Sequence, residues 1–239
     1  MKKSNPRGSI VFPLDLPSLT EALRFVRLLK GHVGVFKVGL ELFVSEGPAV
    51  IEEIKKTAPE GKIFLDLKFH DIPATVKGAM KSAAALGVDF VTVHSDEGQA
   101  LLEAVVEGAG ERTKVLGVTV LTSLAEEDLM DIGIDEKYKD PKTLVLHRAR
   151  LARLAGCSGV VCSGREARAV REEFGGDFLI VTPGVRRSVD AAGDQKRVVT
   201  PYEAISGGAD YIVVGRPIRE AKDPVEAAQS IAAEIEAAL

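Results

Sequence analysis

The chain of 239 residues is 46% hydrophobic and 5% aromatic, contains no tryptophan and carries a formal net charge of −4. A chain of this length forms one large domain or two small ones, and α/β barrels often reach it as a single domain. The charges are mixed along the chain, without a basic tail or a block of lysine and arginine, which argues against a nucleic-acid partner.

The N-terminal segment predicts neither export nor a membrane anchor. The first nine residues are polar and basic, and the apolar run 10–16 is short and is interrupted by Pro13 and Asp15. We therefore expect no signal peptide and no membrane-spanning segment. Cys157 and Cys162 have neither zinc-ligand nor CxxC spacing, which indicates buried thiols in a reducing compartment and predicts a cytoplasmic protein.

Short apolar runs rich in valine, isoleucine and phenylalanine alternate with stretches of helical periodicity. The runs predict strands at 9–15, 34–39, 62–68, 89–95, 114–122, 159–163, 178–184 and 210–216. The stretches between and after them predict helices at 18–30, 41–56, 73–86, 97–109, 140–155, 164–174, 201–207 and 223–238. The acidic segment 125–140 is expected to be a solvated insertion after the fifth strand.

Alternation of eight strands with eight helices indicates a parallel β/α topology. Near-continuous apolar runs are typical of strands that are buried on both faces. The count and the length favour closure into a (β/α)8 TIM barrel, with residues 1–239 forming a single domain. The structural alternative, a doubly wound open sheet, would carry a GxGxxG fingerprint after an early strand, and the sequence contains none.

The strand predicted at 62–68 carries charges where an apolar run is expected. Side chains alternate in direction along a strand, so Phe64, Asp66 and Lys68 share the face that would point into the barrel. Asp66 and Lys68 would then lie at the C-terminal mouth, where barrel active sites are built. The alternative is a structural ion pair, but buried pairs seldom stabilise a fold more than apolar residues do. Asp71 could be a simple helix N-cap before Ile72, or could act together with these two residues.

Other predicted strand ends are also charged. Asp15 closes the first strand, Lys37 lies inside the second, and Arg216 closes the eighth after Gly215. A lysine in a buried strand must find anions or lose its charge. The loop after the eighth strand of such barrels is a common phosphate site. Each residue also has an ordinary explanation, as a surface charge, a snorkelling side chain or a loop cation, but their common position at the mouth favours a shared site.

The segment that follows the seventh strand is longer than an ordinary βα loop. It runs from 182 to 201, is polar, and contains Arg186 and Gln195. We predict a lid over about 185–199 that closes over a phosphate, rather than an unstructured surface loop. His94 at the end of the fourth strand could be a general base, although a structural histidine is the better interpretation, and His70 is expected to serve packing or a subunit contact.

Several of these segments together resemble one enzyme family, the bacterial orotidine 5′-phosphate decarboxylases. The resemblance covers essentially the whole chain in order. Its most specific part is the D-x-K-x-x-D-[IL]-P-x-T run. The matching segments are Asp15, FKVG around Lys37, DLKFHDIPAT (66–75), LTS (121–123), TPGVR (182–186), AGDQ (192–195) and VVGRPI (213–218).

The resemblance implies that orotidine 5′-monophosphate loses CO₂ to give UMP, in a homodimeric barrel with no metal and no organic cofactor. It implies that Lys68 donates a proton to C6 and belongs to a charged network with Lys37 and Asp66. Asp71 would complete this network from the partner subunit, with Ile72 and Thr75 also reaching across. The other substrate contacts implied are Asp15 and Lys37 for the ribose, Thr122 or Ser123 for the pyrimidine, and Pro183, Arg186, Gln195, Gly215 and Arg216 around the phosphate.

Two other functions remain open at this stage. One is a magnesium-dependent decarboxylase or aldolase that acts on a sugar phosphate in a related barrel. Such relatives place a carboxylate near the end of the second strand to hold the metal, whereas this chain has Lys37 there. The other is a catalytically silent barrel that binds a nucleotide. The intact Asp66, Lys68 and Asp71 argue against it, because a pure binder gains nothing from a carboxylate that repels its ligand.

Overall fold

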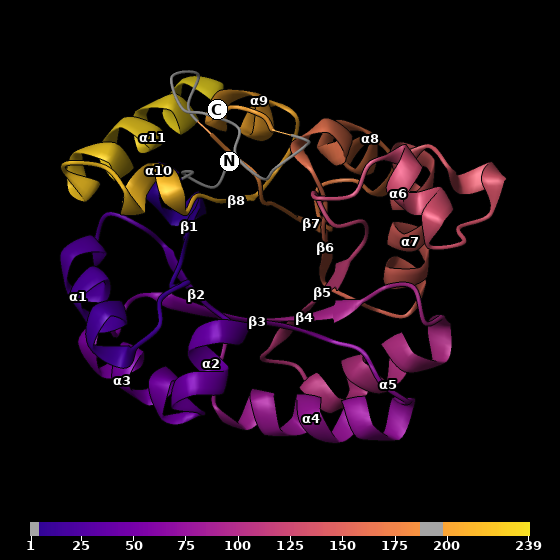
Figure 1. Ribbon diagram of the computed structural model, residues 1–239, viewed down its shortest axis with the longest axis horizontal. Coiled ribbons are helices and arrows are strands. Elements are labelled where there is room, and N and C mark those ends of the chain that lie inside the picture. The colour runs from indigo at the N-terminus through magenta and orange to yellow at the C-terminus, as the bar shows by residue number, and fades with distance from the viewer. Residues whose placement is uncertain (1–4, 187–197) are drawn as a thin grey trace.

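The computed structural model describes residues 5–186 and 198–239, and its strands form a closed parallel barrel (Figure 1). Each strand pairs with the next along the chain, and the eighth pairs back to the first. The predicted barrel fold is confirmed. The strands are β1 (Ile10–Pro13), β2 (Val35–Gly39), β3 (Lys62–Phe69), β4 (Phe90–His94), β5 (Lys114–Val118), β6 (Gly159–Val161), β7 (Leu179–Thr182) and β8 (Tyr211–Val213).

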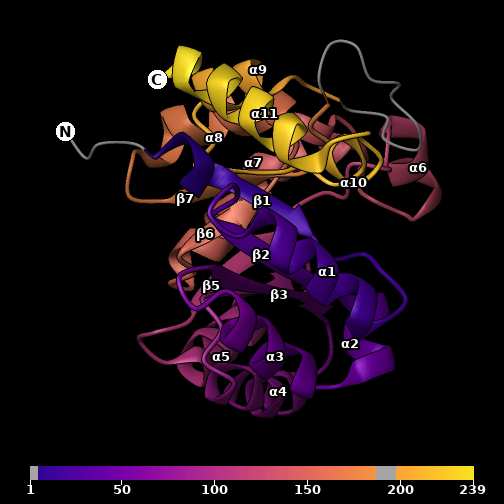
Figure 2. The same cartoon turned by 90° about the vertical axis from the view of Figure 1, so that its left-hand side faces the viewer.

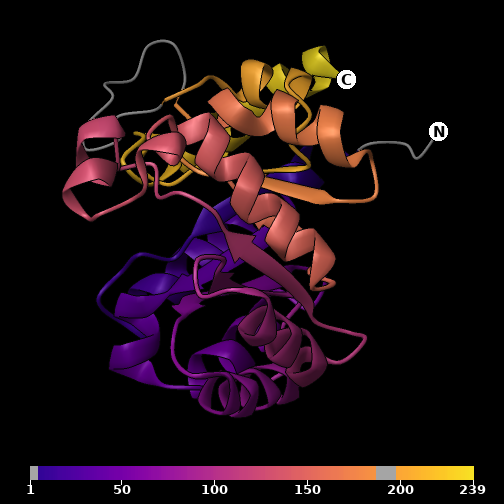
Figure 3. The same cartoon turned by 90° about the vertical axis from the view of Figure 1, so that its right-hand side faces the viewer.

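Helices surround this barrel on the outside (Figures 2 and 3). No helix in the described part of the chain has the length and apolar character needed to span a membrane. The α-helices are α1 (Leu19–Leu29), α2 (Leu40–Glu46), α3 (Ala49–Thr57), α4 (Pro73–Ala85), α5 (Gln99–Ala109), α6 (Glu126–Asp131), α7 (Pro141–Leu154), α8 (Gly164–Phe174), α9 (Pro201–Ser206), α10 (Arg216–Arg219) and α11 (Pro224–Ala238), and the 3-10 helices are η1 (Pro6–Ser9) and η2 (Glu136–Tyr138).

One predicted helix and one predicted insertion differ from the structure. The helix predicted at 41–56 is divided into α2 and α3, because Gly47 ends α2 with a φ of +66° and Pro48 precedes α3. A left-handed residue followed by proline cannot continue a helix. The acidic segment 125–140 is not merely an insertion, since it contains α6 and η2. Both differences lie at the mouth side of the barrel, in segments that follow β2 and β5.

Side chains from alternate strand positions form two separate apolar layers. Phe64 belongs to a small cluster inside the barrel, and its ring lies 6.0 Å from that of Phe90. Ile63 and Leu65 belong instead to the large cluster between barrel and helices. The inward direction predicted for Phe64 is therefore confirmed. Because this inner cluster fills the barrel, any cavity must lie beyond it, towards the strand ends.

The two cysteines are buried, as predicted, and do not form a disulfide. Cys157 is 3% exposed and Cys162 is 1% exposed. Burial raises the pKa of the Cys157 thiol to about 12, and only the thiolate is reactive. We expect the folded protein to resist a thiol reagent such as DTNB at pH 8 and both cysteines to react after unfolding in guanidinium. Modification of the folded protein as fast as of the unfolded chain would contradict this burial.

Candidate active site

A cavity of about 610 Å³ opens at the C-terminal ends of the strands. Its position is where side chains of a β/α barrel are expected to converge on a ligand. The lining brings together most of the predicted site residues, namely Asp15, Lys37, Asp66, Lys68, Thr122, Ser123, Pro183, Arg186, Gly215 and Arg216. These residues come from segments as far apart in sequence as the turn after β1 and the helix α10, so the closure of the barrel brings them together.

Four side chains at one end of the cavity alternate in charge. Lys37 Nζ lies 3.1 Å from Asp15 Oδ1 and 3.4 Å from Asp66 Oδ2. Lys68 Nζ lies 3.0 Å from Asp66 Oδ1. Lys37 and Asp66 are only 8% and 9% exposed, respectively. The buried Lys37 is therefore paired with two carboxylates, as the sequence predicted. The two lysines neutralise the charges of Asp15 and Asp66 without a divalent cation.

The alternation of charge shifts the pKa values of both buried groups towards the ionised forms. Burial alone would lower the pKa of Lys37, but Asp66 and Asp15 together raise it above its ordinary value. Burial alone would raise the pKa of Asp66, but Lys37 and Lys68 lower it below its ordinary value. Because folding raises the pKa of Lys37, this residue stabilises the fold fully at pH values below its pKa in the unfolded chain. That stabilisation is lost as the pH rises through its pKa in the folded protein. Because folding lowers the pKa of Asp66, this residue stabilises the fold fully at pH values above its pKa in the unfolded chain. That stabilisation is lost as the pH falls through its pKa in the folded protein.

Lys68 has an unusual backbone conformation. In residues 5–186 and 198–239 it is the one non-glycine residue with a positive φ, at +51°. A left-handed conformation costs a side-chain-bearing residue about 1–2 kcal/mol. The register between β3 and β4 is irregular at the same place, since Leu65 pairs with Val91 but Phe69 pairs with Val93. Such irregularities re-aim side chains near active sites, and here Lys68 is turned into the cavity.

The cavity wall after β7 and β8 is basic. Arg186 follows β7 and is 7% exposed, and Arg216 begins α10 directly after Gly215. A Cβ atom at Gly215 would lie 2.9 Å from the Pro13 ring, so glycine permits the close approach of that ring to the backbone at 215. β3 and β7 lie four strands apart in a ring of eight. Lys68 and Arg186 thus face the cavity from opposite walls.

Arg219 also lines the cavity, and the sequence alone did not single it out. Its Nη1 donates a hydrogen bond to the backbone oxygen of Asp15, at 2.8 Å. It therefore ties α10 to the segment after β1 that carries the Asp15 carboxylate. The sequence offered little signal, because the strand predicted at 210–216 ends at Val213 and the short helix α10 was not expected.

Three predicted residues lie outside this cavity. Asp71, Ile72 and Thr75 are exposed beyond β3 and do not contribute to the lining. The N-cap alternative for Asp71 is wrong, because Ile72 occupies the N-cap position of α4 without a side-chain capping bond. The Asp71 carboxylate instead accepts a hydrogen bond from the Ile72 N–H at 2.6 Å.

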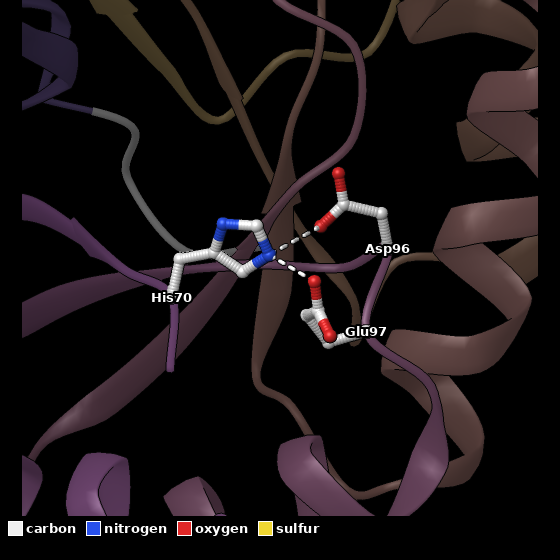
Figure 4. A group of neighbouring side chains, drawn as sticks. All are labelled: His70, Asp96 and Glu97. Atoms are coloured by element: carbon white, nitrogen blue, oxygen red, sulfur yellow. Dashed lines mark hydrogen bonds and ion pairs between the residues drawn. The ribbon is translucent and has the colours of Figure 1, made fainter. Parts of the chain in front are cut away.

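His70 points away from the cavity, towards the segment after β4 (Figure 4). Its Nε2 contacts Glu97 and lies 3.8 Å from Asp96 Oδ1, and these three side chains could hold a metal ion. All three are exposed and already paired, and Arg148 lies 3.4 Å from Asp96. The arrangement is therefore accounted for as a network of polar contacts beside the active site.

His94 packs against His70, with ring centroids 5.2 Å apart, and does not line the cavity. Burial lowers its pKa, and Asp96 opposes that shift without overcoming it. His70, Lys68 and Arg148 add to the lowering of the pKa, so the imidazole is harder to protonate than an ordinary histidine. This environment favours the structural interpretation of His94 over the general base.

The predicted lid is described only at its base. Arg186 N donates a hydrogen bond to the Val199 backbone oxygen at 3.0 Å, and Val185 pairs with Val199. Residues 187–197 lie outside the described part of the chain, and the phosphate ligand predicted at Gln195 falls among them.

Comparisons with known proteins agree on one family. The model of the Orotidine 5′-phosphate decarboxylase / HUMPS family matches residues 8–231. Orotidine 5′-phosphate decarboxylase of Desulfosudis oleivorans is 48% identical over 242 residues, which cover 100% of this chain and 97% of that protein. The corresponding enzyme of Geotalea daltonii is 46% identical, covering 98% of this chain and 99% of that one. The crystal structure of orotidine 5′-phosphate decarboxylase from Lactobacillus acidophilus matches with a TM-score of 0.82 and 36% identity, over 95% of this chain and 98% of that one.

Proposed function

Because this chain belongs to the Orotidine 5′-phosphate decarboxylase / HUMPS family, we propose that it is a carboxy-lyase that converts orotidine 5′-monophosphate into UMP and CO₂. The observation that carries the proposal is the meeting of the charged network of Asp15, Lys37, Asp66 and Lys68 with Arg186 and Arg216 in one cavity. A nucleoside monophosphate has the matching polarity, with its phosphate at one end and its reacting base at the other. One barrel domain would carry the whole reaction, in the cytoplasm.

The chemistry explains why lysines lie at the reacting end. Loss of CO₂ from C6 leaves a carbanion whose electron pair lies outside the π-system of the ring, so it must be stabilised through space by a preorganised site. At about 4 Å and an effective dielectric constant near 20, the attraction between a lysine and this carbanion is on the order of 4 kcal/mol. Lys68 would supply this charge and then donate its proton to C6. The left-handed backbone of Lys68, with a φ of +51°, supports this role, since its side chain lines the cavity.

Asp66 would act on the substrate rather than on the intermediate. Its carboxylate would repel the substrate carboxylate by an energy of a similar order, about 4 kcal/mol, and the repulsion would fade as CO₂ leaves. Both effects favour the transition state over the ground state. They fall short of the roughly 8–23 kcal/mol of typical enzymatic catalysis, so binding energy from the phosphate end is the candidate for the remainder.

The other lining residues would hold the substrate in register. Asp15 and Lys37 would bind the ribose hydroxyls, and Thr122 or Ser123 the pyrimidine. Pro183, Arg186, Gly215 and Arg216 surround the space in which the phosphate would lie. Gln195 is proposed to join them.

Replacement of Arg216 by alanine is expected to lower kcat/KM for orotidine 5′-monophosphate by about 10- to 150-fold, the value of one charge-assisted hydrogen bond. Steady-state kinetics would measure this loss, with Arg27→Ala on the exposed face of α1 as the matched control. The nucleoside orotidine lacks the phosphate, so its much slower turnover should hardly change in the variant. An equal loss with both substrates would place Arg216 elsewhere than at the phosphate.

The exposed residues beyond β3 support a homodimer with shared active sites. Ile72 is 67% exposed, and Leu40 and Val44 on the neighbouring α2 are 55% and 80% exposed. Exposed apolar side chains that gather into one patch mark an interface. We propose that a second copy covers them and inserts its own Asp71 near Lys68.

Mixing two inactive variants tests this shared site. Lys68→Ala and Asp71→Ala homodimers should each be nearly inactive, whereas exchange of subunits gives heterodimers with one intact site. Activity should then return to about a quarter of the wild-type level, because half of the dimers are mixed and half of their sites are complete. Sedimentation as a monomer at assay concentrations, or no recovery after exchange, would contradict the shared site.

The function itself is tested with orotidine 5′-monophosphate in the presence of a chelator, by following the ultraviolet change as UMP forms. Rapid turnover supports a decarboxylase that needs no added metal. Turnover of a sugar phosphate that magnesium restores would favour the related metal-dependent reaction instead. Tight binding of UMP without turnover would indicate a silent nucleotide-binding barrel.

A further inference from the structure

The structure contains a residue on β4 that connects the two central groups of the charged network. Thr92 is fully buried, and its hydroxyl makes two hydrogen bonds. It accepts one from the backbone N–H of Lys68 at 2.9 Å and donates the other to Asp66 Oδ1 at 2.9 Å. A hydroxyl has one proton to donate, so these two bonds fix its orientation completely.

The bond to Lys68 lies at the irregular part of the β3–β4 pairing. Between the pairs Leu65–Val91 and Phe69–Val93, β3 advances by more residues than β4 does. The backbone N–H of Lys68 lies within this irregular stretch, and it donates its hydrogen bond to the Thr92 hydroxyl oxygen. A buried N–H needs such a partner. The same bond restrains the left-handed backbone from which the Lys68 side chain enters the cavity.

The bond to Asp66 fixes the rotation of the carboxylate. Oδ1 accepts the hydrogen bond from the Thr92 hydroxyl and faces Lys68 Nζ, while Oδ2 faces Lys37 Nζ. Without the hydroxyl, the carboxylate could rotate about its Cβ–Cγ bond, and both lysines would move with it. Charged groups in an active site must be held within a fraction of an ångström, and a 1 Å displacement can cost about 100-fold in rate.

We propose that Thr92 is a positioning residue that holds Asp66 and Lys68 in their reactive arrangement. The assignment rests on the proposed function, in which Lys68 protonates the substrate. Thr92 does not line the cavity, so it acts through these two residues rather than on the substrate. Its hydroxyl group, and not its volume, is the part that matters.

Thr92→Val tests the proposal because valine keeps the shape and removes both hydrogen bonds. We expect kcat to fall by about 10- to 100-fold, while the dissociation constant of UMP changes by less than about threefold. Thr92→Ser keeps the hydroxyl and should retain kcat within about threefold of the wild type. The matched control is Thr113→Val, which removes the bond from another buried threonine hydroxyl to the Val88 backbone oxygen, away from the cavity.

A kcat within twofold of the wild type for Thr92→Val would overturn the proposal, as would an equal loss in Thr92→Ser or in the Thr113→Val control. A crystal structure of Thr92→Val separates this result from a failure of the proposed function. The Lys68 backbone or the Asp66 carboxylate should rotate in the variant, whether or not the wild type decarboxylates the nucleotide. An unchanged arrangement of both groups would reject the positioning role even if the enzyme is active.

Discussion

Replacement of Lys68 by alanine is expected to lower kcat by about 10⁴-fold or more, because one side chain supplies both the proton and the nearest positive charge. UMP should still bind within a few fold of the wild-type affinity, since the phosphate and ribose contacts come from other residues. The Lys68 side chain is 31% exposed and Asp66 keeps its contact with Lys37, so the variant should fold. Single-turnover kinetics and UMP titration would measure the two effects separately.

A chemical rescue distinguishes the lost ammonium group from a disturbed fold. Small alkylammonium ions that enter the vacated space should restore part of the activity of Lys68→Ala and leave the wild type unaffected. Lys114→Ala is the matched control, because Lys114 begins β5 at the far end of the barrel and is exposed. A Lys68→Ala enzyme with more than a tenth of the wild-type kcat would exclude Lys68 as the proton donor.

Asp66→Asn is expected to give the second largest effect, on both stability and catalysis. Asparagine keeps the shape but leaves the buried Lys37 with one carboxylate partner. Loss of one partner of a buried ion pair costs about 3–5 kcal/mol, and we expect the free energy of unfolding at pH 7 to fall by about 3 kcal/mol. The kcat should fall by about 100- to 1000-fold as the lysines lose their fixed arrangement.

The pH dependence of this stability difference has a definite sign. The pKa of Asp66 is lowered in the folded protein, so the wild-type advantage should be present above the ordinary aspartate pKa and disappear as the pH falls through the folded value. Denaturant unfolding of both proteins between pH 3 and 7 would follow the convergence. Asp177→Asn, which breaks an exposed pair with Arg153, should cost far less. A difference that persists unchanged at pH 3 would contradict an ionised Asp66.

Asp66→Asn also measures the repulsion of the substrate carboxylate. If that repulsion contributes to catalysis, the variant should bind orotidine 5′-monophosphate more tightly relative to UMP than the wild type does. An unchanged ratio of the two affinities would assign the catalytic effect to the lysines alone.

The fold was predictable because its signal is repeated along the chain. Apolar strands alternate with amphipathic helices, and each repeat supports the same parallel topology. The boundaries were less predictable, as the division of the helix predicted at 41–56 shows. That division depends on the Gly47–Pro48 pair, whose local effect was outweighed by the apolar periodicity on both sides.

The candidate site was predictable where charge interrupts an apolar run. Lys37 and Asp66 are conspicuous in the sequence because a charged side chain in a buried strand is costly unless it serves a site. Thr92 and Arg219 carry no such signal. A threonine suits any strand, and the significance of Thr92 comes from a register irregularity that strict alternation of side chains does not contain. The arrangement of residues across β3 and β4 is a tertiary property, which the order of residues in either strand does not reveal.

Closure of the barrel has a consequence for biosynthesis. Val11 of β1 pairs with Val213 of β8, so the ribosome must add on the order of 200 residues before the first strand finds its second neighbour. Until then β1 and the latest strand each present an edge of unpaired backbone groups, which can pair with another chain. We therefore expect nascent and truncated forms that lack β8 to aggregate and to depend on chaperones. The finished ring has no free edge and escapes this hazard.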